Sequence, residues 1–114
     1  MRAAGFDVVV ARDAMQALMV AMRSKPAVIL LDINMPGGTG MQTLRQLKAN
    51  ATTSLIPVII VSGSDDSALV ERVMALGAAD YLRKPFDFDD VLRILSRVTG
   101  KPLNSQVRSL TRVV

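Results

Sequence analysis

The feature that most constrains the fold is a regular alternation of short apolar runs with longer amphipathic stretches. Four apolar runs have the length and composition of strands, and four stretches carry apolar residues at helical spacing. The predicted strands are 8–10, 27–31, 58–61 and 79–82, and the predicted helices are 13–22, 39–47, 66–76 and 87–98. Strands and helices that alternate about every 20 to 30 residues are typical of βαβ units with right-handed crossovers. The pattern predicts an α/β fold with a doubly wound parallel sheet.

Helix boundaries carry their own signals. The candidate N-caps share a short polar side chain that can accept a hydrogen bond from an early helical amide. They are Asp13, Thr39, Asp65 or Asp66, and Asp87. Gly77 follows the third helix, and we expect it to end that helix in the left-handed conformation.

Composition excludes several classes of function. The 114 residues suffice for one core but not for two. The chain has no Cys and no His, so disulfides, thiolate zinc sites, imidazole bases and phosphohistidine carriers are excluded. No apolar run approaches the roughly 18 residues of a membrane helix, and we expect no signal peptide before the domain. We expect a cytoplasmic protein without membrane contact.

The net charge of +4 would ordinarily raise the expectation of nucleic-acid binding. Here the basic residues are scattered over helix faces, and aromatic residues, 4% of the chain, are not interleaved among them. Only the tail from Lys101, with Arg108 and Arg112, is locally basic. We therefore favour a solvated surface over a nucleic-acid site, and expect residues 1–99 to form the domain and residues 100–114 a basic tail or the start of a linker.

Three reactive side chains follow three of the apolar runs. Asp32 ends VILLD, Ser62 ends VIIVS, and Lys84 follows DYLR. Open α/β sheets bind ligands at the carboxyl ends of their strands, where these groups should meet. A carboxylate, a hydroxyl and an ammonium gathered at one edge suit the holding of a phosphoryl group on the carboxylate. Transfer to a carboxylate nucleophile depends on neutralisation of charge, which an ammonium and hydrogen-bond donors supply.

Taken together, DINMPGGTG, VIIVSGS and GAADYLRKPF resemble the receiver domain of two-component response regulators, and the similarity covers residues 1 to about 99. The resemblance implies a flavodoxin-like strand order 2-1-3-4-5. It implies that Asp32 is the phospho-acceptor, Ser62 the switch hydroxyl and Lys84 the ammonium that pairs with the phosphoryl group. Two further matches are Tyr81, as a switch aromatic, and Pro85, as a proline after a cis peptide.

The resemblance also implies a Mg²⁺ ion held by the Asp32 carboxylate and the backbone carbonyl of Asn34. The family completes this site with two acids at the end of its first strand. That strand and most of the first helix are predicted to be missing from this chain, because MRAAG resembles the last turn of a helix with Gly5 as its C-cap. The metal site is therefore expected to lack ligands.

A missing central strand would leave two neighbouring strands with unpaired backbone. We expect either a homodimer formed by strand exchange or occupation of the vacancy by the tail, since SLTRVV, residues 109–114, has strand propensity.

The implied partner is a sensor histidine kinase or a phosphotransfer protein, and the implied chemistry is limited to the chain's own phosphorylation and dephosphorylation. One alternative is an interaction module that works without phosphorylation. Another is a hydrolase, which usually has a second Asp where this chain has Asn34.

Each candidate site residue also has a purely structural explanation. Asp32 can cap a turn, Ser62 can satisfy a loop amide, and Lys84 can be a solvated charge; for Tyr81 a half-buried aromatic is as good an account as a switch.

Overall fold

The computed structural model describes residues 2–3, 6–11, 14–24, 26, 28–33, 40–63, 66–99 and 109–113. The strands are β1 (Arg2–Ala3), β2 (Phe6–Ala11), β3 (Val28–Asp32), β4 (Val58–Ser62), β5 (Asp80–Arg83) and β6 (Ser109–Val113). The helices are α1 (Ala14–Ser24), α2 (Gly40–Ala49), α3 (Ser67–Ala75) and α4 (Phe88–Thr99). The four predicted helices and the four predicted strands are all present, with boundaries that differ by a few residues.

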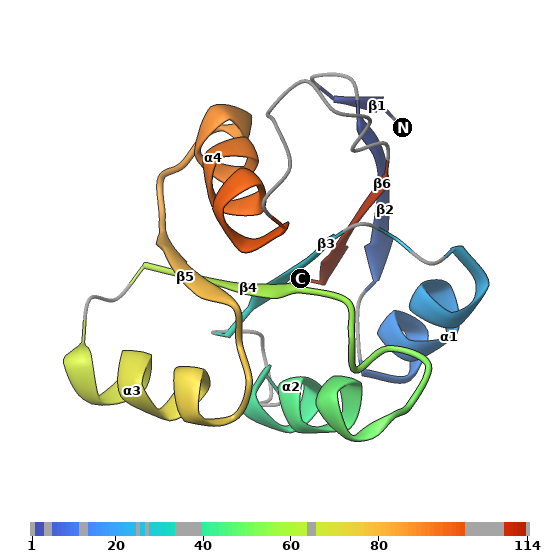
Figure 1. The fold of residues 1–114 in the computed structure, drawn as a ribbon, viewed down its shortest axis with the longest axis horizontal. Helices are drawn as coiled ribbons and strands as arrows, with labels where there is room; N and C mark the ends of the chain where they lie inside the picture. The colour runs from blue at the N-terminus through green and yellow to red at the C-terminus, as the bar shows by residue number, and fades with distance from the viewer. Residues whose placement is uncertain are drawn as a thin grey trace.

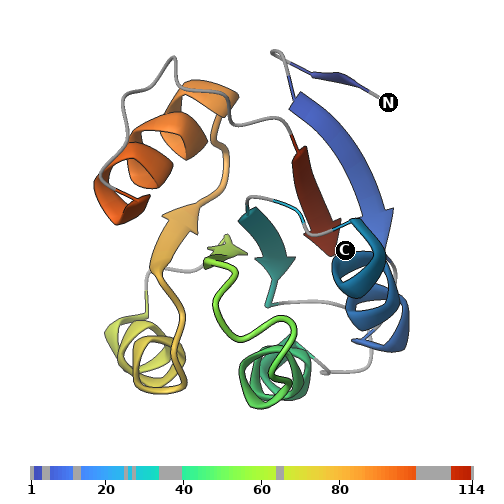
Figure 2. The same ribbon diagram turned by 45° about the vertical axis from the view of Figure 1, so that its right-hand side comes forward.

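The strands form one sheet in the order β1-β2-β6-β3-β4-β5 (Figures 1 and 2). The pairs β2–β6, β6–β3, β3–β4 and β4–β5 are parallel, whereas β1 pairs with β2 in the antiparallel direction. Helices α1, α2 and α3 cover one face of the sheet, and α4 covers the other (Figure 1). The predicted doubly wound parallel sheet is confirmed.

The strand β6 comes from the tail and lies between β2 and β3 (Figure 2). Thr111 is the register partner of both Val9 on β2 and Ile29 on β3. The predicted occupation of the vacancy by the tail is thus confirmed for residues 109–113, and β6 holds the central position that the resemblance gives to the first strand. Strand exchange between protomers stays a prediction.

The expected helical turn at the amino end is wrong for Arg2 and Ala3. These two residues form β1 and pair with Asp7 and Phe6. A segment this short has no periodicity from which to distinguish a helix end from a strand, and the outer edge of β2 offers it backbone partners. Gly5, the expected C-cap, lies outside the described residues.

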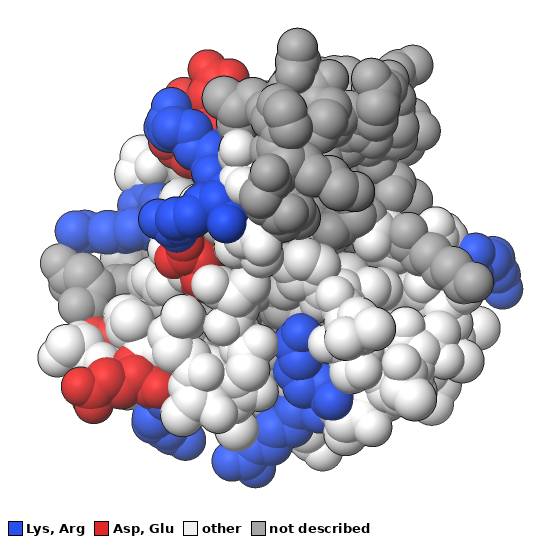
Figure 3. All heavy atoms as spheres, in the orientation of Figure 1, with Lys and Arg blue, Asp and Glu red and all other residues white. Residues whose placement is uncertain are grey.

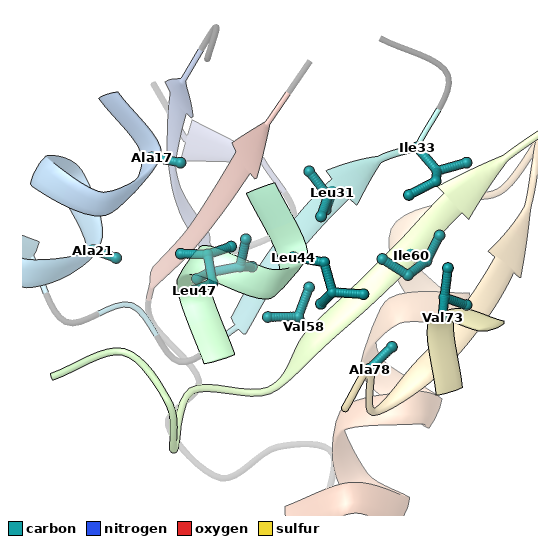
Figure 4. Close-up of a cluster of buried hydrophobic side chains, with 11 residues drawn as sticks. Ala17, Ala21, Leu31, Ile33, Leu44, Leu47, Val58, Ile60, Val73 and Ala78 are labelled. Atoms are coloured by element: carbon teal, nitrogen blue, oxygen red, sulfur yellow. The ribbon is translucent and has the colours of Figure 1, made fainter. Parts of the chain in front are cut away.

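The core has two parts, one on each face of the sheet. On the face of α1, α2 and α3, side chains from β3 and β4 interdigitate with Leu44, Leu47 and Val73 (Figure 4). On the opposite face, Val28, Leu30, Ile59 and Val61 pack with Val91 of α4. Both faces of β3 and β4 are therefore buried, which explains why these strands read as continuous apolar runs rather than alternating ones.

Two of the predicted N-caps are confirmed. The Asp66 carboxylate accepts a hydrogen bond from the amide of Ala68 at 2.9 Å. At the start of α4, the amide of Asp90 donates to the Asp87 carboxylate and the amide of Asp87 donates to the Asp90 carboxylate, each at 3.0 Å. This reciprocal pair caps the first turn of α4, where the amide of Asp90 also donates to the carbonyl oxygen of Asp87 at 3.1 Å. The other candidates, Asp13, Thr39 and Asp65, lie outside the described residues.

A lysine holds the turn after α2. The Lys48 ammonium donates to the carbonyl oxygens of Ser54 at 3.0 Å and Ile56 at 3.1 Å. Its aliphatic stem lies against Gly77, which has the predicted positive φ, at 104°. Burial lowers the pKa of Lys48 below its ordinary value of 10.5. Lys48 therefore joins the turn before β4 to the turn before β5.

Candidate functional site

The site is built on the carboxyl ends of β3, β4 and β5. Asp32 is the last residue of β3 and is the register partner of Val61 on β4. Ser62 is the last residue of β4 and is paired with Arg83 at the end of β5. The backbone continues this alignment past the strands, because the amide of Ile33 donates to the Val61 carbonyl at 3.1 Å. The parallel register therefore brings three consecutive strand ends to one edge of the sheet.

Lys84, which directly follows β5, contacts both Asp32 and Ser62. Its ammonium forms an ion pair and a hydrogen bond with the Asp32 carboxylate, 52 positions away in the sequence. Its backbone amide donates to the carbonyl oxygen of Ser62 at 2.8 Å. One residue thus contacts both other members of the group, with its side chain on Asp32 and its main chain on Ser62. The bond between Lys84 and Pro85 is cis, as expected.

The three side chains differ in their access to solvent. Ser62 is fully buried, the Asp32 side chain is 17% exposed and the Lys84 side chain is 39% exposed. Solvent thus reaches the Asp32–Lys84 ion pair, although Asp32 stands on a strand that is otherwise buried. A carboxylate that is reachable, close to an ammonium and mounted on a rigid strand has the properties of a nucleophile or of a ligand for a cationic group.

Tyr81 lies away from this edge. It is the second residue of β5, is paired with Ile60 and packs partly buried against the core on the face of α1, α2 and α3. The structure thus brings together Asp32, Ser62 and Lys84 but not Tyr81. Asn34 and the rest of the loop 34–39 lie outside the described residues.

One residue next to the site, Gly40, was not predicted from the sequence. It allows α2 to lie close to the backbone beside Asp32. A Cβ on Gly40, the first residue of α2, would lie 2.7 Å from the carbonyl oxygen and 2.8 Å from the Cα of Ile33. Such distances are too short for any side chain, so α2 approaches the backbone next to Asp32 closely only because residue 40 is glycine. The available signal was a glycine at the first position of a predicted helix, where other residues have better helix propensity.

The described residues supply only one of the two magnesium ligands that the resemblance assigns to this chain, the Asp32 carboxylate. Mg²⁺ needs oxygen ligands in octahedral geometry, usually with one or two carboxylates. In the described ranges no group of three or more acidic, His or Cys residues could hold a metal. Asp32 supplies a single carboxylate, and the Lys84 ammonium already contacts it. The described residues therefore lack the ligand set that the resemblance implies.

The comparisons with known proteins agree on one family. The family model "Response regulator receiver domain" matches residues 1–96. Protein PilH of Pseudomonas aeruginosa is 40% identical over 94 residues, which are 82% of this chain and 78% of PilH. Response regulator PleD of Caulobacter vibrioides is 39% identical over 109 residues, which are 94% of this chain but only 21% of PleD.

Solved structures give the same result. The receiver domain of the sensor histidine kinase PA1611 from P. aeruginosa, with a magnesium ion in its active-site cleft, has a TM-score of 0.71 and 30% identity, over 85% of this chain and 80% of that one. The chemotaxis response regulator CheY4 of Vibrio cholerae has a TM-score of 0.71 and 29% identity, over 83% of this chain and 79% of that one. Among the helices that the structure describes, none combines the length and the apolar character that crossing a membrane requires.

Proposed function

Because this chain belongs to the response regulator receiver family, we propose that it accepts a phosphoryl group on Asp32 from a sensor histidine kinase or a phosphotransfer protein in the cytoplasm. The observation that carries the proposal is the ion pair between Asp32 and Lys84, formed at the edge where Ser62 also ends its strand. In this proposal residues 1–99 form the receiver domain, and the segment 109–113 completes its sheet.

The geometry supports a direct transfer. A carboxylate oxygen of Asp32 attacks the phosphorus atom, a new P–O bond forms, and the bond from phosphorus to the donor breaks with its electron pair leaving on the donor. Lys84 neutralises charge on the phosphoryl oxygens, and the Ser62 hydroxyl donates a hydrogen bond to one of them. The described residues offer Mg²⁺ a single carboxylate, and no step here involves the metal. Hydrolysis of the acyl phosphate returns Asp32 to its original state, and this self-directed chemistry is the only reaction proposed.

Phosphorylation would act as a switch. The phosphoryl group adds close to two negative charges at Asp32 and attracts the Ser62 hydroxyl. The carbonyl oxygen of Ser62 accepts a hydrogen bond from the amide of Lys84, the residue that follows β5. Tyr81, on that same strand, would report the change to the surface formed by α3, β5 and α4. That surface would bind a partner protein or a second copy; strand exchange through the segment 109–113 is a second route to a homodimer.

The test is a measurement of intact mass after incubation with a small phosphodonor, with and without Mg²⁺. We expect the wild-type chain to gain one phosphoryl group and Asp32→Asn to gain none, whereas Asp66→Asn, which alters an exposed acid at the start of α3, should react like the wild type. Lys84→Ala should slow the reaction on the order of 10²-fold. Arg83→Ala changes the neighbouring cation and should have little effect.

A phosphorylation-independent interaction module is the second candidate. The observation that favours it is that the described part of the site provides only one carboxylate. If the wild-type chain stays unmodified by phosphodonors with Mg²⁺ while it remains folded by circular dichroism, the first proposal is wrong and this one stands.

A further inference from the structure

Helix α1 exposes a row of methionines on the side that faces away from the core. Met15, Met19 and Met22 are 73%, 53% and 45% exposed, and they follow one another at intervals of four and three residues. That spacing places them on one stripe of the helix surface. On the inward side of the same helix, Ala17 and Ala21 are fully buried in the core. Helix α1 is thus apolar on two sides, and packing inside the chain explains only one of them.

Among the described residues, the charged side chains of α1 and of the neighbouring helix α2 are all basic. Helices α1 and α2 contain no acidic residue, and Asp32 is the only acid between residues 14 and 63. Arg23 on α1 and Arg45 on α2 are both exposed. In Figure 3 the acidic atoms that are drawn lie over α3, β5 and α4, whereas the described surface over α1 and α2 is white and blue. In the described part of the chain, the row therefore lies on a helix with basic and no acidic residues.

The row also has the dimensions of a helix contact. The seven residue steps from Met15 to Met22 rise about 10 Å along the axis, or roughly two helical turns. A ridge of that length fits the groove between side chains of a second helix that carries its own apolar residues at intervals of three and four. Methionine suits such a contact, because its unbranched side chain adapts to the partner's shape.

We propose that α1, through the row Met15, Met19 and Met22, binds an amphipathic helix of a partner protein whose polar flanks are acidic. The apolar face of that helix covers the three methionines, and its carboxylates lie near Arg23 and Arg45. The charges steer the encounter and set its orientation, and burial of the methionines supplies the affinity. The contact uses neither Asp32 nor Lys84, so it does not depend on the proposed phosphorylation.

The experiment uses the full chain labelled with ¹³C at the methionine methyl groups. The probe is a synthetic helical peptide with leucines at heptad positions a and d and glutamates at most of the others. We expect titration to shift the signals of Met15, Met19 and Met22, and to leave that of Met74, a 42% exposed methionine on α3, unchanged. The triple variant Met15→Gln, Met19→Gln, Met22→Gln should weaken binding at least tenfold, whereas Met74→Gln should not.

Two further experiments distinguish an acidic partner helix from a basic helix and from a lipid surface. A matched peptide with lysine in place of glutamate should bind much more weakly, since it meets Arg23 and Arg45 with the same charge. Vesicles of anionic phospholipid should not shift the three methionine signals. Equal binding of both peptides, a response of Met74 equal to that of the row, or a stronger response to vesicles than to the acidic peptide would each overturn the proposal. None of these results depends on whether Asp32 can be phosphorylated.

Discussion

At the scale of single residues, Gly40 shows how little space separates α2 from the strand that carries Asp32. We predict that Gly40→Ala lowers the free energy of unfolding by about 1–3 kcal/mol, because its Cβ would overlap backbone atoms that cannot turn aside. Urea denaturation measures the change. Gly63→Ala is the control, since a Cβ there meets nothing within 4 Å. Equal stability of the two variants would contradict the close approach of α2.

The lowered pKa of Lys48 predicts how the stability of the chain depends on pH. The folded pKa of Lys48 lies below 10.5 because burial disfavours the charged form. Between the folded pKa and 10.5 the unfolded chain binds more protons, so stability rises with pH in that window and stays level below it. We expect wild type to gain stability relative to Lys48→Met as the pH rises towards 10.5. Denaturation at a series of pH values tests this, and parallel curves for the two proteins would disprove it.

The roles of residues were predictable to different degrees. Asp32, Ser62 and Lys84 each follow an apolar run, and the rule that parallel strands end at one edge was enough to place them together. Gly40 and Lys48 were missed because their importance comes from contacts with Ile33 and Gly77, which no local pattern specifies.

At the scale of elements, α4 is the one described helix on its face of the sheet, and its first turn depends on Asp87. We predict that Asp87→Ala costs about 1 kcal/mol of stability, because the amide of Asp90 loses its side-chain acceptor and keeps only its bond to the carbonyl oxygen of residue 87. Asp89→Ala is the matched control. Asp89 is exposed in the same turn and contributes only a favourable charge near the helix start, worth a few tenths of a kcal/mol. Thermal unfolding followed by circular dichroism compares them, and the prediction is wrong if both changes cost the same.

Most of the helices and strands could be predicted from the sequence. β3 and β4 are buried on both faces and hence appear in the sequence as unbroken apolar runs. The N-caps of α3 and α4, Asp66 and Asp87, are residue types that commonly cap helices. β1 was not readable, since its two residues are held by backbone pairing with β2 rather than by any preference of their own side chains.

At the scale of the whole molecule, β6 is the only described strand that pairs with both β2 and β3. We predict that Thr111→Pro destabilises the chain by about 1–3 kcal/mol or more, since it removes an amide from the centre of the sheet. Ser109→Pro, at the first residue of the same strand, should be tolerated far better. Hydrogen exchange of the β2 and β3 amides measures the effect, and equal protection in the two variants would show that β6 does not hold these strands.

The sequence predicted a vacancy and a strand able to fill it, but it could not decide between the chain's own tail and that of a second copy. Both arrangements allow the same backbone pairing of this strand with β2 and β3. They differ only in the entropy of the connection through residues 100–108 and in protein concentration, neither of which a pattern of residues encodes.

The position of β6 also governs the order of events on the ribosome. Residues 6–11 and 28–32 are synthesised well before residues 109–113, the strand that joins them. Until then the nascent chain has two strands with unsatisfied edges and apolar faces, a condition that invites chaperones and aggregation. Completion of this sheet is therefore expected to follow translation of the tail rather than to proceed in step with it.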